Sequence, residues 1–585
     1  MSSTSPVKVP IGPQSVHWNT APIQRTVLVL AHNITALTRL LDVIPVFDSD
    51  PRVQVVFSWN GADPFRHGLD ALLDELGVIT IPWDQAIQSE FDLAITANHS
   101  GLTEINAPVV VVSHGIGYTK YSPGETRKPG NPETRKPGNP ETRKPGNPET
   151  REVFGLAPRW VTYDGRPIAA ALVFSHEEQR DRLAVSAPAA LSSAVVAGDP
   201  CYDRILASRA LREHYRQALG VADGRRLVVL SSTWGPRSLV GAWPDLCRAL
   251  LADLPADSYQ VAAALHPNLW HGHSPWQVRT WLAGCVRAGL ALIPPVEGWR
   301  AALIAADCVI GDHGSVTSYG AALDIPTLLG AFPADDVAPG SPVDVLGGLA
   351  PRLDRAGGLR GQVDLAIDRH RPGQYAAVTE LVSSVPGESA ARLRALCYSL
   401  LRLAEPAGEV PVPRLPITGL PGRRLTPSAS LVSCEFTATT ATLTRYPAEP
   451  WQGRPDGPPL PSTHLAVSAD HPGQRFLGAA DVLLAAEPDL SLGAERWLAD
   501  IGRTRTAAVV TGANTCLVST RDGKWIEVVA DDRSTCDPAL FASVVHAWLA
   551  TGNPIDGLGP ELTVQAGQTS GRVRISQRLR RTAAR

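Results

Sequence analysis

The sequence predicts an α/β protein with two Rossmann-like domains that face a cleft, followed by a small C-terminal α/β domain. Short, continuous apolar runs alternate with helical stretches from residue 25 onward, which is typical of a parallel sheet covered by helices on both faces. The same alternation starts again near residue 190. A Pro- and Gly-rich stretch at residues 405–425 then precedes a third region and is expected to be a linker.

The first Rossmann-like domain is expected at residues 21–190, after a disordered polar tail at residues 1–20. Its first strand, RTVLVLAH, precedes the helical stretch ITALTRLLDVIPVF, and no G-x-G-x-x-G motif follows that strand. Five buried strands are expected, at residues 25–32, 53–59, 77–83, 91–98 and 107–115.

The second Rossmann-like domain is expected at residues 191–404 and is predicted to bind the donor substrate. Two such halves facing each other across a cleft form the architecture called GT-B. Ligands of open α/β sheets bind beyond the carboxyl ends of the strands, so the loops that leave those ends are expected to carry the chemistry. Strands are expected at residues 192–198, 227–233, 259–267, 291–295, 307–315 and 324–330, and a closing helix at 387–404.

The third region, residues 426–570, is expected to be a small α+β accessory domain, and its sequence contains no catalytic constellation. Residues 571–585, GRVRISQRLRRTAAR, contain six arginines and no acidic residue. They are expected to form a basic tail suited to anionic lipid or phosphate. A solvated, arginine-rich chain end explains the same composition equally well.

Charge and composition exclude several classes of protein. A chain of 585 residues needs more than one hydrophobic core, and its net charge of −3 argues against a general nucleic-acid binder. No apolar run approaches the roughly 20 residues of a membrane-spanning helix, and no secretory signal is visible. The eight scattered cysteines form no C-x-x-C pair, as expected of reduced thiols. A cytoplasmic protein is therefore expected, and its preference for arginine over lysine indicates a GC-rich gene, such as those of actinobacteria.

An octapeptide repeat interrupts the first domain at residues 125–151, where ETRKPGNP occurs three times and a fourth copy begins. The enclosing loop, residues 122–152, is expected to be disordered because the repeat contains no residue able to build a core. Recent duplication in a tolerant surface loop explains the identical copies, since lengthening a loop costs little free energy. A mobile cationic flap beside the acceptor site is the functional alternative.

The loop after the strand at residues 107–115 carries His114, and Lys120 follows closely. An imidazole at a strand end can accept a proton from an attacking hydroxyl, and its ordinary pKa suits that role near neutral pH. A histidine that caps the next helix explains the position equally well. A general base and a helix cap therefore stay open as alternatives.

Other strand ends carry further candidate ligands. Asp203 would hold a ribose or order the domain junction, although turn chemistry alone explains its Gly-Asp-Pro loop, and Thr233 is a second candidate binding residue. His266 ends another strand and can stabilise charge that develops on a phosphate oxygen. Its spacing to His271 and His273 resembles a metal site, but no acidic residue lies nearby, so no metal is expected.

The loop GDHGS leaves its strand directly into a helix whose first residues are small and polar. Free backbone N–H groups at that helix N-terminus, together with hydroxyl side chains, would cradle a diphosphate. N-capping by Asp312 or Ser315 explains one polar residue, but not a succession of five polar or glycine residues. The diphosphate cradle is predicted to consist of Gly311, Asp312, Gly314, Ser315 and Thr317.

In this order, the four loops resemble the CDP-glycerol glycerophosphotransferase family, the teichoic-acid primases and polymerases. SHGIGYTK is similar to the family's His-Gly loop with a following lysine, and GDPCYD to its Gly-x-Pro-Arg-x-Asp loop. LHPN is similar to its His-Pro, and GDHGS to the Thr-Asp-Tyr-Ser-Ser loop before its phosphate-binding helix. The resemblance covers residues 25–400 and none of the third domain.

The resemblance implies a GT-B transferase that moves a glycerol- or polyol-phosphate from a CDP-linked donor to a hydroxyl acceptor in cell-envelope polymer synthesis. It implies His114 as the general base and His266 as the group that stabilises the transferring phosphate. Ser315 and Gly314 would hold the diphosphate, with no metal or cofactor. The implied partners are a CDP-alcohol and a polymer or lipid-linked acceptor, at an anionic membrane surface on the cytoplasmic side, without nucleic acid.

Three positions depart from the family's motifs, because Gly314 stands for a serine, His313 for a tyrosine and Cys201 for an arginine. Arginine is a strong phosphate ligand, so its absence favours other donors. GDHGS also resembles the Asp-Ser-Gly-Gly loop of UDP-N-acetylglucosamine 2-epimerases, which makes a UDP-dependent glycosyltransferase or epimerase-like enzyme the first alternative. The second alternative is a non-catalytic regulatory or scaffold protein that binds a nucleotide or polyanion.

Overall fold

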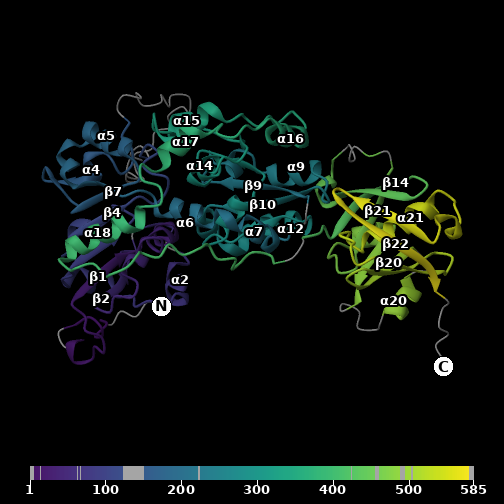
Figure 1. Cartoon of the computed structure of the whole chain (residues 1–585), viewed down its shortest axis with the longest axis horizontal. Coiled ribbons are helices and arrows are strands. Elements are labelled where there is room, and N and C mark those ends of the chain that lie inside the picture. The colour runs from purple at the N-terminus through teal and green to yellow at the C-terminus, as the bar shows by residue number, and fades with distance from the viewer. Residues whose placement is uncertain are drawn as a thin grey trace, which may run out of the picture.

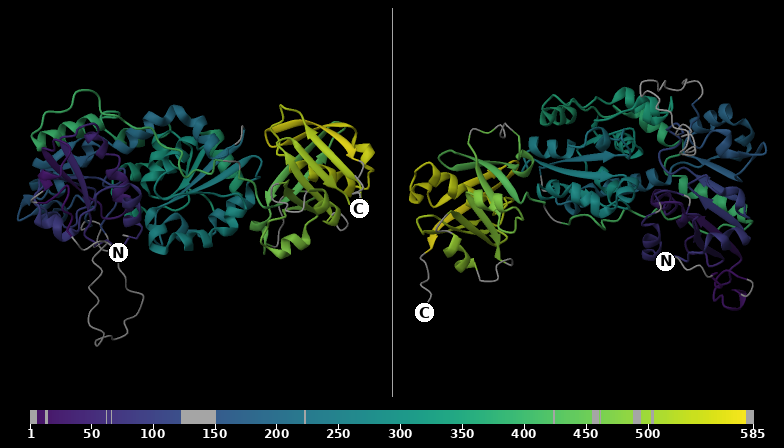
Figure 2. Two further views of the ribbon diagram at one scale, coloured as in Figure 1. Left: turned by 90° about the horizontal axis from the view of Figure 1, so that it is seen from below. Right: turned by 180° about the vertical axis from the view of Figure 1, so that it is seen from behind.

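The structure is a computed structural model and describes residues 6–578 except 13–14, 62, 66, 123–150, 222–223, 423–424, 455–459, 461, 488–493 and 502–504. The octapeptide repeat therefore lies outside the described residues, apart from its last one. Three units lie in a row along the longest axis of the molecule (Figures 1 and 2). The second α/β unit occupies the middle, between the first α/β unit and the C-terminal unit.

The first sheet has six parallel strands in the order β2-β1-β3-β4-β7-β8. Helices cover both faces, because Val27 and Val29 of β1 pack in one buried cluster while Leu28 and Leu30 pack in another. The strands are β1 (Arg25–Leu30), β2 (Val53–Ser58), β3 (Leu93–Thr96), β4 (Val109–Val112), β7 (Ala171–Phe174) and β8 (Ala194–Val196). The helices are α1 (Ile34–Leu40), α2 (Leu69–Glu75), α3 (Trp83–Gln88), α4 (Pro158–Val161) and α5 (Glu177–Ser186).

Two predicted strands of this half are corrected by the structure. In the stretch 77–83, only Thr80 forms a bridge, with Phe57, because Gly77 turns the chain and Pro82 cannot donate to a ladder. The stretch 192–198 was expected to open the second domain, but β8 pairs in parallel with β7 and completes the first sheet. An apolar run identifies a buried strand without indicating which sheet it joins.

The second sheet has five parallel strands in the order β11-β10-β9-β12-β13. The strands are β9 (Arg226–Ser232), β10 (Tyr259–Leu265), β11 (Ala291–Ile293), β12 (Cys308–Gly311) and β13 (Thr327–Leu329). The helices are α6 (Pro200–Ser208), α7 (Arg212–Ala218), α8 (Leu239–Ala242), α9 (Leu246–Asp253), α10 (Pro267–His273), α11 (Pro275–Trp281), α12 (Ala283–Arg287), α13 (Trp299–Ala305), α14 (Ser315–Ala322), α15 (Pro342–Leu349), α16 (Leu359–Arg369) and α17 (Ala376–Val382).

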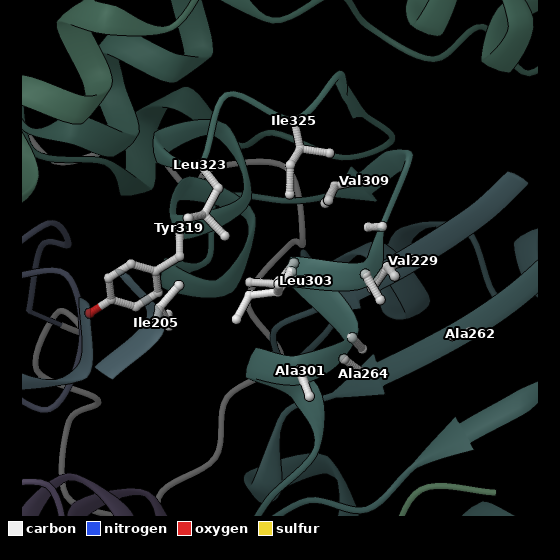
Figure 3. Close-up of a cluster of buried hydrophobic side chains, with 14 of the residues drawn as sticks. Ile205, Val229, Ala262, Ala264, Ala301, Leu303, Val309, Tyr319, Leu323 and Ile325 are labelled. Carbon is white, nitrogen blue, oxygen red and sulfur yellow. The ribbon is translucent and has the colours of Figure 1, made fainter. Parts of the chain in front are cut away.

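A buried cluster fills one face of this second sheet (Figure 3). Leu303 of α13 lies at its centre, Val309 of β12 lies near Ile325, and the ring of Tyr319 packs at its edge. The hydroxyl of Tyr319 points away from the cluster, toward the first domain. The core of the second domain thus places a polar atom at the junction of the two domains.

The chain returns to the first domain after α17. Helix α18 (Ser389–Leu401) lies beside β1 and β2 in Figure 1, and its Leu393 and Cys397 belong to a buried cluster of the first domain. The hydroxyl of Tyr398 donates to Asp50 Oδ2 at 2.7 Å. Helix α18 thus ties the end of the second half to the first half.

The expected linker at residues 405–425 lies against the second domain. The hydroxyl of Tyr215 donates to the carbonyl of Leu415 at 3.0 Å, and the N–H of Leu415 donates to Ser208 Oγ at 3.0 Å. The expected N-terminal tail is likewise attached in part, since the N–H of Val7 donates to Gln85 Oε1 at 2.8 Å. Both segments are held by hydrogen bonds at these points.

The third unit contains nine strands that close into a barrel, in the order β14-β15-β21-β22-β20-β19-β18-β17-β16. Its pairs are mixed, because β15–β21, β16–β17 and β17–β18 are parallel and the others are antiparallel. The strands are β14 (Ala429–Phe436), β15 (Thr440–Pro447), β16 (His464–Ser468), β17 (Val482–Ala486), β18 (Thr506–Gly512), β19 (Thr515–Ser519), β20 (Trp525–Ala530), β21 (Glu561–Ala566) and β22 (Thr569–Arg578). The helices are α19 (Gln474–Ala479), α20 (Ala494–Ile501) and α21 (Leu540–Ala550).

The predicted basic tail at residues 571–585 is wrong for its first eight residues, which belong to β22. Val573 is buried while Arg572 and Arg574 are exposed, so the segment alternates as a strand with one buried face does. Arg572 pairs with Glu561 at 2.9 Å and Arg578 with Glu527 at 3.4 Å. The arginines near the chain end thus have acidic neighbours on adjacent strands.

The barrel is attached at the amino ends of the strands of the second sheet, opposite the first domain (Figure 1). Arg445 of β15 is buried and pairs with Asp257, next to the start of β10, at 2.6 Å and with Asp537 at 2.8 Å. Glu449 pairs with Arg287 at the end of α12 at 2.5 Å. The carboxyl ends of the same strands face the first domain, and they carry the candidate site. Within the described ranges, no helix has both the length and the apolarity to cross a membrane.

Candidate active site

The loop after β4 and the start of α14 touch each other across the domain junction. The N–H of Ile116 donates to Ser315 Oγ at 3.2 Å. A Cβ atom on Gly115 would lie 2.5 Å from the same oxygen, so this position requires glycine. The His-Gly loop and the predicted diphosphate helix thus belong to one site.

Three basic side chains converge at this contact. Desolvation lowers the pKa of His266 to about 3, and the nearby Lys120 and His114 lower it further. Desolvation likewise lowers the pKa of His114 to about 4, with Arg39 and Lys120 adding to the effect. Both imidazoles are therefore neutral at pH 7. His114 is exposed, whereas His266 is half-buried.

The tautomer of His266 follows from its backbone contact. Its Nδ1 accepts a hydrogen bond from the N–H of Asn268 at 3.0 Å and caps α10. The proton of the neutral ring therefore lies on Nε2, which is left to donate to a ligand. His266 therefore caps α10 through Nδ1.

His313 is a further histidine of the site, which the sequence analysis treated only as a replaced tyrosine. It is buried and its Nδ1 has no partner among the described residues. Desolvation lowers its pKa to about 3, and the charges of Lys120 and Arg237 contribute. The charge of Lys120 lowers the pKa of all three histidines.

Arg39 of α1 holds the loop that carries His114. Its Nε donates to the carbonyl of Ser113 at 2.8 Å, and one terminal nitrogen donates to the carbonyl of Gly115 at 2.7 Å. The guanidinium thus bonds to the backbone on both sides of His114 and fixes its position. The sequence analysis missed Arg39, although a charged residue within the apolar stretch ITALTRLLDV was a visible signal.

The same guanidinium joins the two domains. Its other terminal nitrogen donates to Asp199 Oδ1 at 2.7 Å, and the hydroxyl of Tyr319 donates to Asp199 Oδ2 at 2.6 Å. Asp199 also caps α6 by accepting from the N–H of Cys201 at 2.9 Å. The Tyr319 hydroxyl seen in Figure 3 is therefore part of a buried network that links α1, α6 and α14.

Asp312 and Thr233 support the site from within the second domain. Asp312 Oδ2 accepts from the N–H of Thr233 at 2.8 Å, from its hydroxyl at 2.7 Å and from the N–H of Leu239 at 2.9 Å. Burial raises the pKa of Asp312, and the charge of Lys120 opposes this rise. Both side chains face each other, so they hold the loop after β9 in place.

The remaining cradle residues show why glycine is needed here. A Cβ on Gly311 would lie 2.2 Å from Thr317 Oγ1, and a Cβ on Gly314 would lie 2.6 Å from Thr233 Cγ2. Thr317 is fully buried, and its hydroxyl has no hydrogen-bond partner among the described residues. Of the predicted cradle, Ser315 and the backbone at Gly314 are the groups at the junction.

Asp203 lies outside this group. Its Oδ1 accepts from the N–H of Gly387 at 2.7 Å, and its Oδ2 accepts from the N–H of Ser389 at 3.0 Å and from the Ser389 hydroxyl. The carboxylate therefore holds the start of α18. Of the two roles expected for Asp203, these bonds correspond to ordering the domain junction.

Cys201, at the position of the family's arginine, takes part in a buried ion network. Its Sγ accepts from Arg300 Nε at 3.2 Å, and Arg300 pairs with Asp42 at 2.7 Å. Arg204, one turn further along α6, pairs with the other oxygen of Asp42. The positive charge near Cys201 is thus supplied by other residues and is neutralised there.

The two domains also touch on either side of the site. The N–H of Ala338 donates to the carbonyl of Thr119 at 2.8 Å, and Lys120 forms an antiparallel bridge with Val337. On the other side, the ring centroids of Phe65 and Trp234 are 4.8 Å apart. The structure therefore shows the two halves in contact around the histidines.

The histidines of α10 do not form a metal site. The ring of His273 packs against Trp281 at 4.9 Å, while a Cβ on Gly68 would touch the ring of His271. Within the described ranges, no group of three or more His, Cys, Asp or Glu side chains could hold a metal ion.

No family model matches the chain, and no curated protein sequence matches it. Among solved structures, the chain is similar to the wall teichoic acid polymerase TagF. The identity is 12%, the match covers 66% of this chain and 90% of that chain, and the TM-score is 0.42. TagF is a polymerase of the type that the sequence motifs resemble.

Two further similar structures were solved with UDP. One is Alr3699/HepE of Anabaena in complex with UDP and glucose, with 11% identity, coverage of 65% and 100%, and a TM-score of 0.35. The other is MnaA of S. aureus with UDP, with 10% identity, coverage of 66% and 99%, and a TM-score of 0.39.

Proposed function

We propose that the chain is a GT-B transferase that uses a nucleotide-diphosphate donor and moves a glycerol- or polyol-phosphate to a hydroxyl acceptor. The observation that carries this proposal is the contact between the His114 loop and the N-terminus of α14, with Lys120 and His266 beside it. A proton acceptor, a donor to a phosphate oxygen and a helix N-terminus lie together at the carboxyl ends of two parallel sheets.

The reaction follows from these groups. Neutral His114 accepts the proton of the acceptor hydroxyl while the oxygen attacks the phosphorus that carries the polyol. A new P–O bond forms, the bond to the nucleoside monophosphate breaks, and that group leaves with the bonding electrons. Nε2–H of His266 and the ammonium of Lys120 stabilise the charge on the phosphate oxygens. The backbone at Gly314 and Ser315 holds the diphosphate.

Binding of nucleotides to the intact chain is the first test. Thermal shifts should be compared for CDP-glycerol, CDP-ribitol, UDP-sugars and CMP. Stabilisation by CDP-alcohols alone supports the proposed donor, while stabilisation by UDP-sugars alone favours the glycosyltransferase or epimerase-like alternative. A protein that responds to none of them would fit the scaffold alternative.

The second part of the proposal concerns an anionic membrane surface, where a lipid-linked acceptor would lie. Helix α11 exposes Trp276 to 70% and Trp281 to 55%, and no Asp or Glu occurs from residue 258 to residue 296. Arg279 lies between the two tryptophans. Exposed indoles beside arginine favour the interface of an anionic bilayer. This helix replaces the basic tail as the membrane-binding surface, because the arginines of β22 have acidic neighbours.

A further inference from the structure

An aromatic group lies beside His114 on the side of the first domain. The ring centroid of Phe154 is 6.3 Å from that of His114, with the rings at 74° to each other. Trp160 lies 4.8 Å from Phe154, and the ring of His99 lies 6.0 Å from Phe154 and 6.2 Å from Trp160. We name Phe154, Trp160 and His99 the aromatic wall.

The aromatic wall keeps part of its surface exposed. All three side chains are half-buried. The Nδ1 atom of His99 has no hydrogen-bond partner within the described part of the chain. That nitrogen is itself buried, so it is not offered to a ligand. The wall thus presents half-buried aromatic rings next to the proposed base.

The backbone directs Phe154 toward the site. Its N–H donates to the carbonyl of Lys120 at 2.9 Å, and Tyr121 forms an antiparallel bridge with Val153. Gly155 has a φ of +80°, and a Cβ there would lie 2.6 Å from the ring of Tyr118. Glycine is therefore required where the chain leaves Phe154.

The wall lies on the acceptor side of the reaction. The groups assigned to the donor, Ser315 and His266, come from the second domain, whereas His114 and the wall come from the first. The acceptor hydroxyl must approach the ring of His114 to give up its proton. The rest of the acceptor then lies against the side chains that surround this ring. The acceptor would therefore touch Phe154.

The chemistry of the wall points to a saccharide. Aromatic faces carry negative electrostatic potential and attract the slightly positive C–H face of a pyranose. A polyphosphate chain would need several unpaired cations, but Arg159 beside Trp160 already pairs with Glu152 at 2.8 Å.

We propose that the aromatic wall is the acceptor subsite and that it binds a glycosyl unit whose hydroxyl is the attacking group. The proposal rests on the proposed function for the role of His114, and it adds the substrate class. The wall is a binding surface, and it takes no part in the proton transfer.

The experiment uses the full chain and saturation-transfer difference NMR with methyl glycosides of glucose and N-acetylglucosamine as probes. Signal should concentrate on the protons of one ring face. Phe154→Leu, which keeps apolar volume without an aromatic face, should weaken probe binding about tenfold, the loss of one stacking contact. Phe154→Tyr should restore it. Tyr163→Ala is the matched control, because Tyr163 is an aromatic residue of the same segment that is 62% exposed.

Donor binding in the same variants separates this proposal from the proposed function. Nucleotides should bind equally to Phe154→Leu and the parent chain, and glycosides should bind even where no nucleotide does. The subsite proposal is overturned if the glycosides give no signal, if Phe154→Leu binds them as the parent does, or if glycerol phosphate oligomers compete them off through the wall.

Discussion

Arg39 and Asp199 form a buried ion pair at 2.7 Å, and the same guanidinium bonds to the carbonyls on both sides of His114. Arg39 belongs to the first domain and Asp199 caps α6, which enters the second. Tyr319 reaches the pair from α14. The position of the proposed base therefore depends on the contact between the domains.

Arg39→Lys should lower kcat about 100-fold, because a small displacement of a reacting group has effects of this size. The dissociation constant of the nucleotide should stay within a factor of two to three (~0.6 kcal/mol). Steady-state kinetics with thermal denaturation would check this. Arg52→Lys is the control, since Arg52 also pairs with an aspartate, Asp50, but away from the site. Equal losses in both variants would show that Arg39 acts only on stability.

His114→Ala should abolish turnover and leave nucleotide binding nearly unchanged. Loss of a general base costs about 100- to 10,000-fold in rate. Product formation and nucleotide calorimetry on the same preparation measure the two effects. Turnover at the parent rate would refute the assignment of His114 as the base.

Activity should persist well below neutral pH. Burial lowers the pKa of His114 to about 4, so kcat/KM should fall only as the pH approaches that value. An acidic limb near pH 6.5 would instead mean that His114 titrates as in water. The profile should be measured over the range in which the chain stays folded.

Stability should decrease as the pH is lowered from neutral. The pKa of a histidine in an unfolded chain is about 6.5. Burial lowers the pKa of His266 in the folded chain to about 3. Between these values the unfolded chain binds more protons, so protonation favours unfolding. His266→Gln should therefore flatten the dependence of Tm on pH between 7 and 4. An unchanged slope would show that other groups cause it.

The double variant Trp276→Ala, Trp281→Ala should lose binding to vesicles that contain phosphatidylglycerol. The parent should cosediment with these vesicles and bind neutral vesicles less, because arginine adds to the burial of the indoles. Trp18→Ala is the matched control, as Trp18 is 69% exposed and lies in the N-terminal segment. The surface assignment fails if both variants sediment as the parent does.

Excision of two octapeptide units should leave activity on a small soluble acceptor unchanged. The N–H of Ser122 donates to the carbonyl of Glu152 at 2.8 Å, so the base of the loop is fixed without the repeat. Activity on a polymer acceptor at low salt tests the flap alternative. A selective loss there would support the flap, and equal activity would leave duplication as the explanation.

The sequence predicts most strands of both parallel sheets, because long apolar runs have few other structures. It also indicates which side chains follow strand ends, and the structure brings His114, Lys120, His266 and Ser315 together. The pattern cannot show that β8 joins the first sheet, since a buried strand looks alike in either sheet.

Other features needed three-dimensional information. Val573 and Ile575 alternate with arginines in the sequence, which is typical of a strand. The high arginine content of residues 571–585 nevertheless favoured a basic tail. Arg39 acts through partners far along the chain, such as Asp199 at 160 residues, and Phe154 lies against His114 in an earlier segment. Single-sequence patterns contain no record of such pairs. The role of Asp203 was likewise decided by neighbours far along the chain, Gly387 and Ser389.

The attachment of the barrel behind the second sheet has a mechanical consequence. Arg445 and Glu449 fasten the barrel to the second domain, through Asp257 and Arg287. If the site opens, the first domain and α18 would move as one rigid body. The second domain and the barrel would move together as the other. A molecule that binds the barrel would therefore immobilise the second domain and leave the first domain free to move.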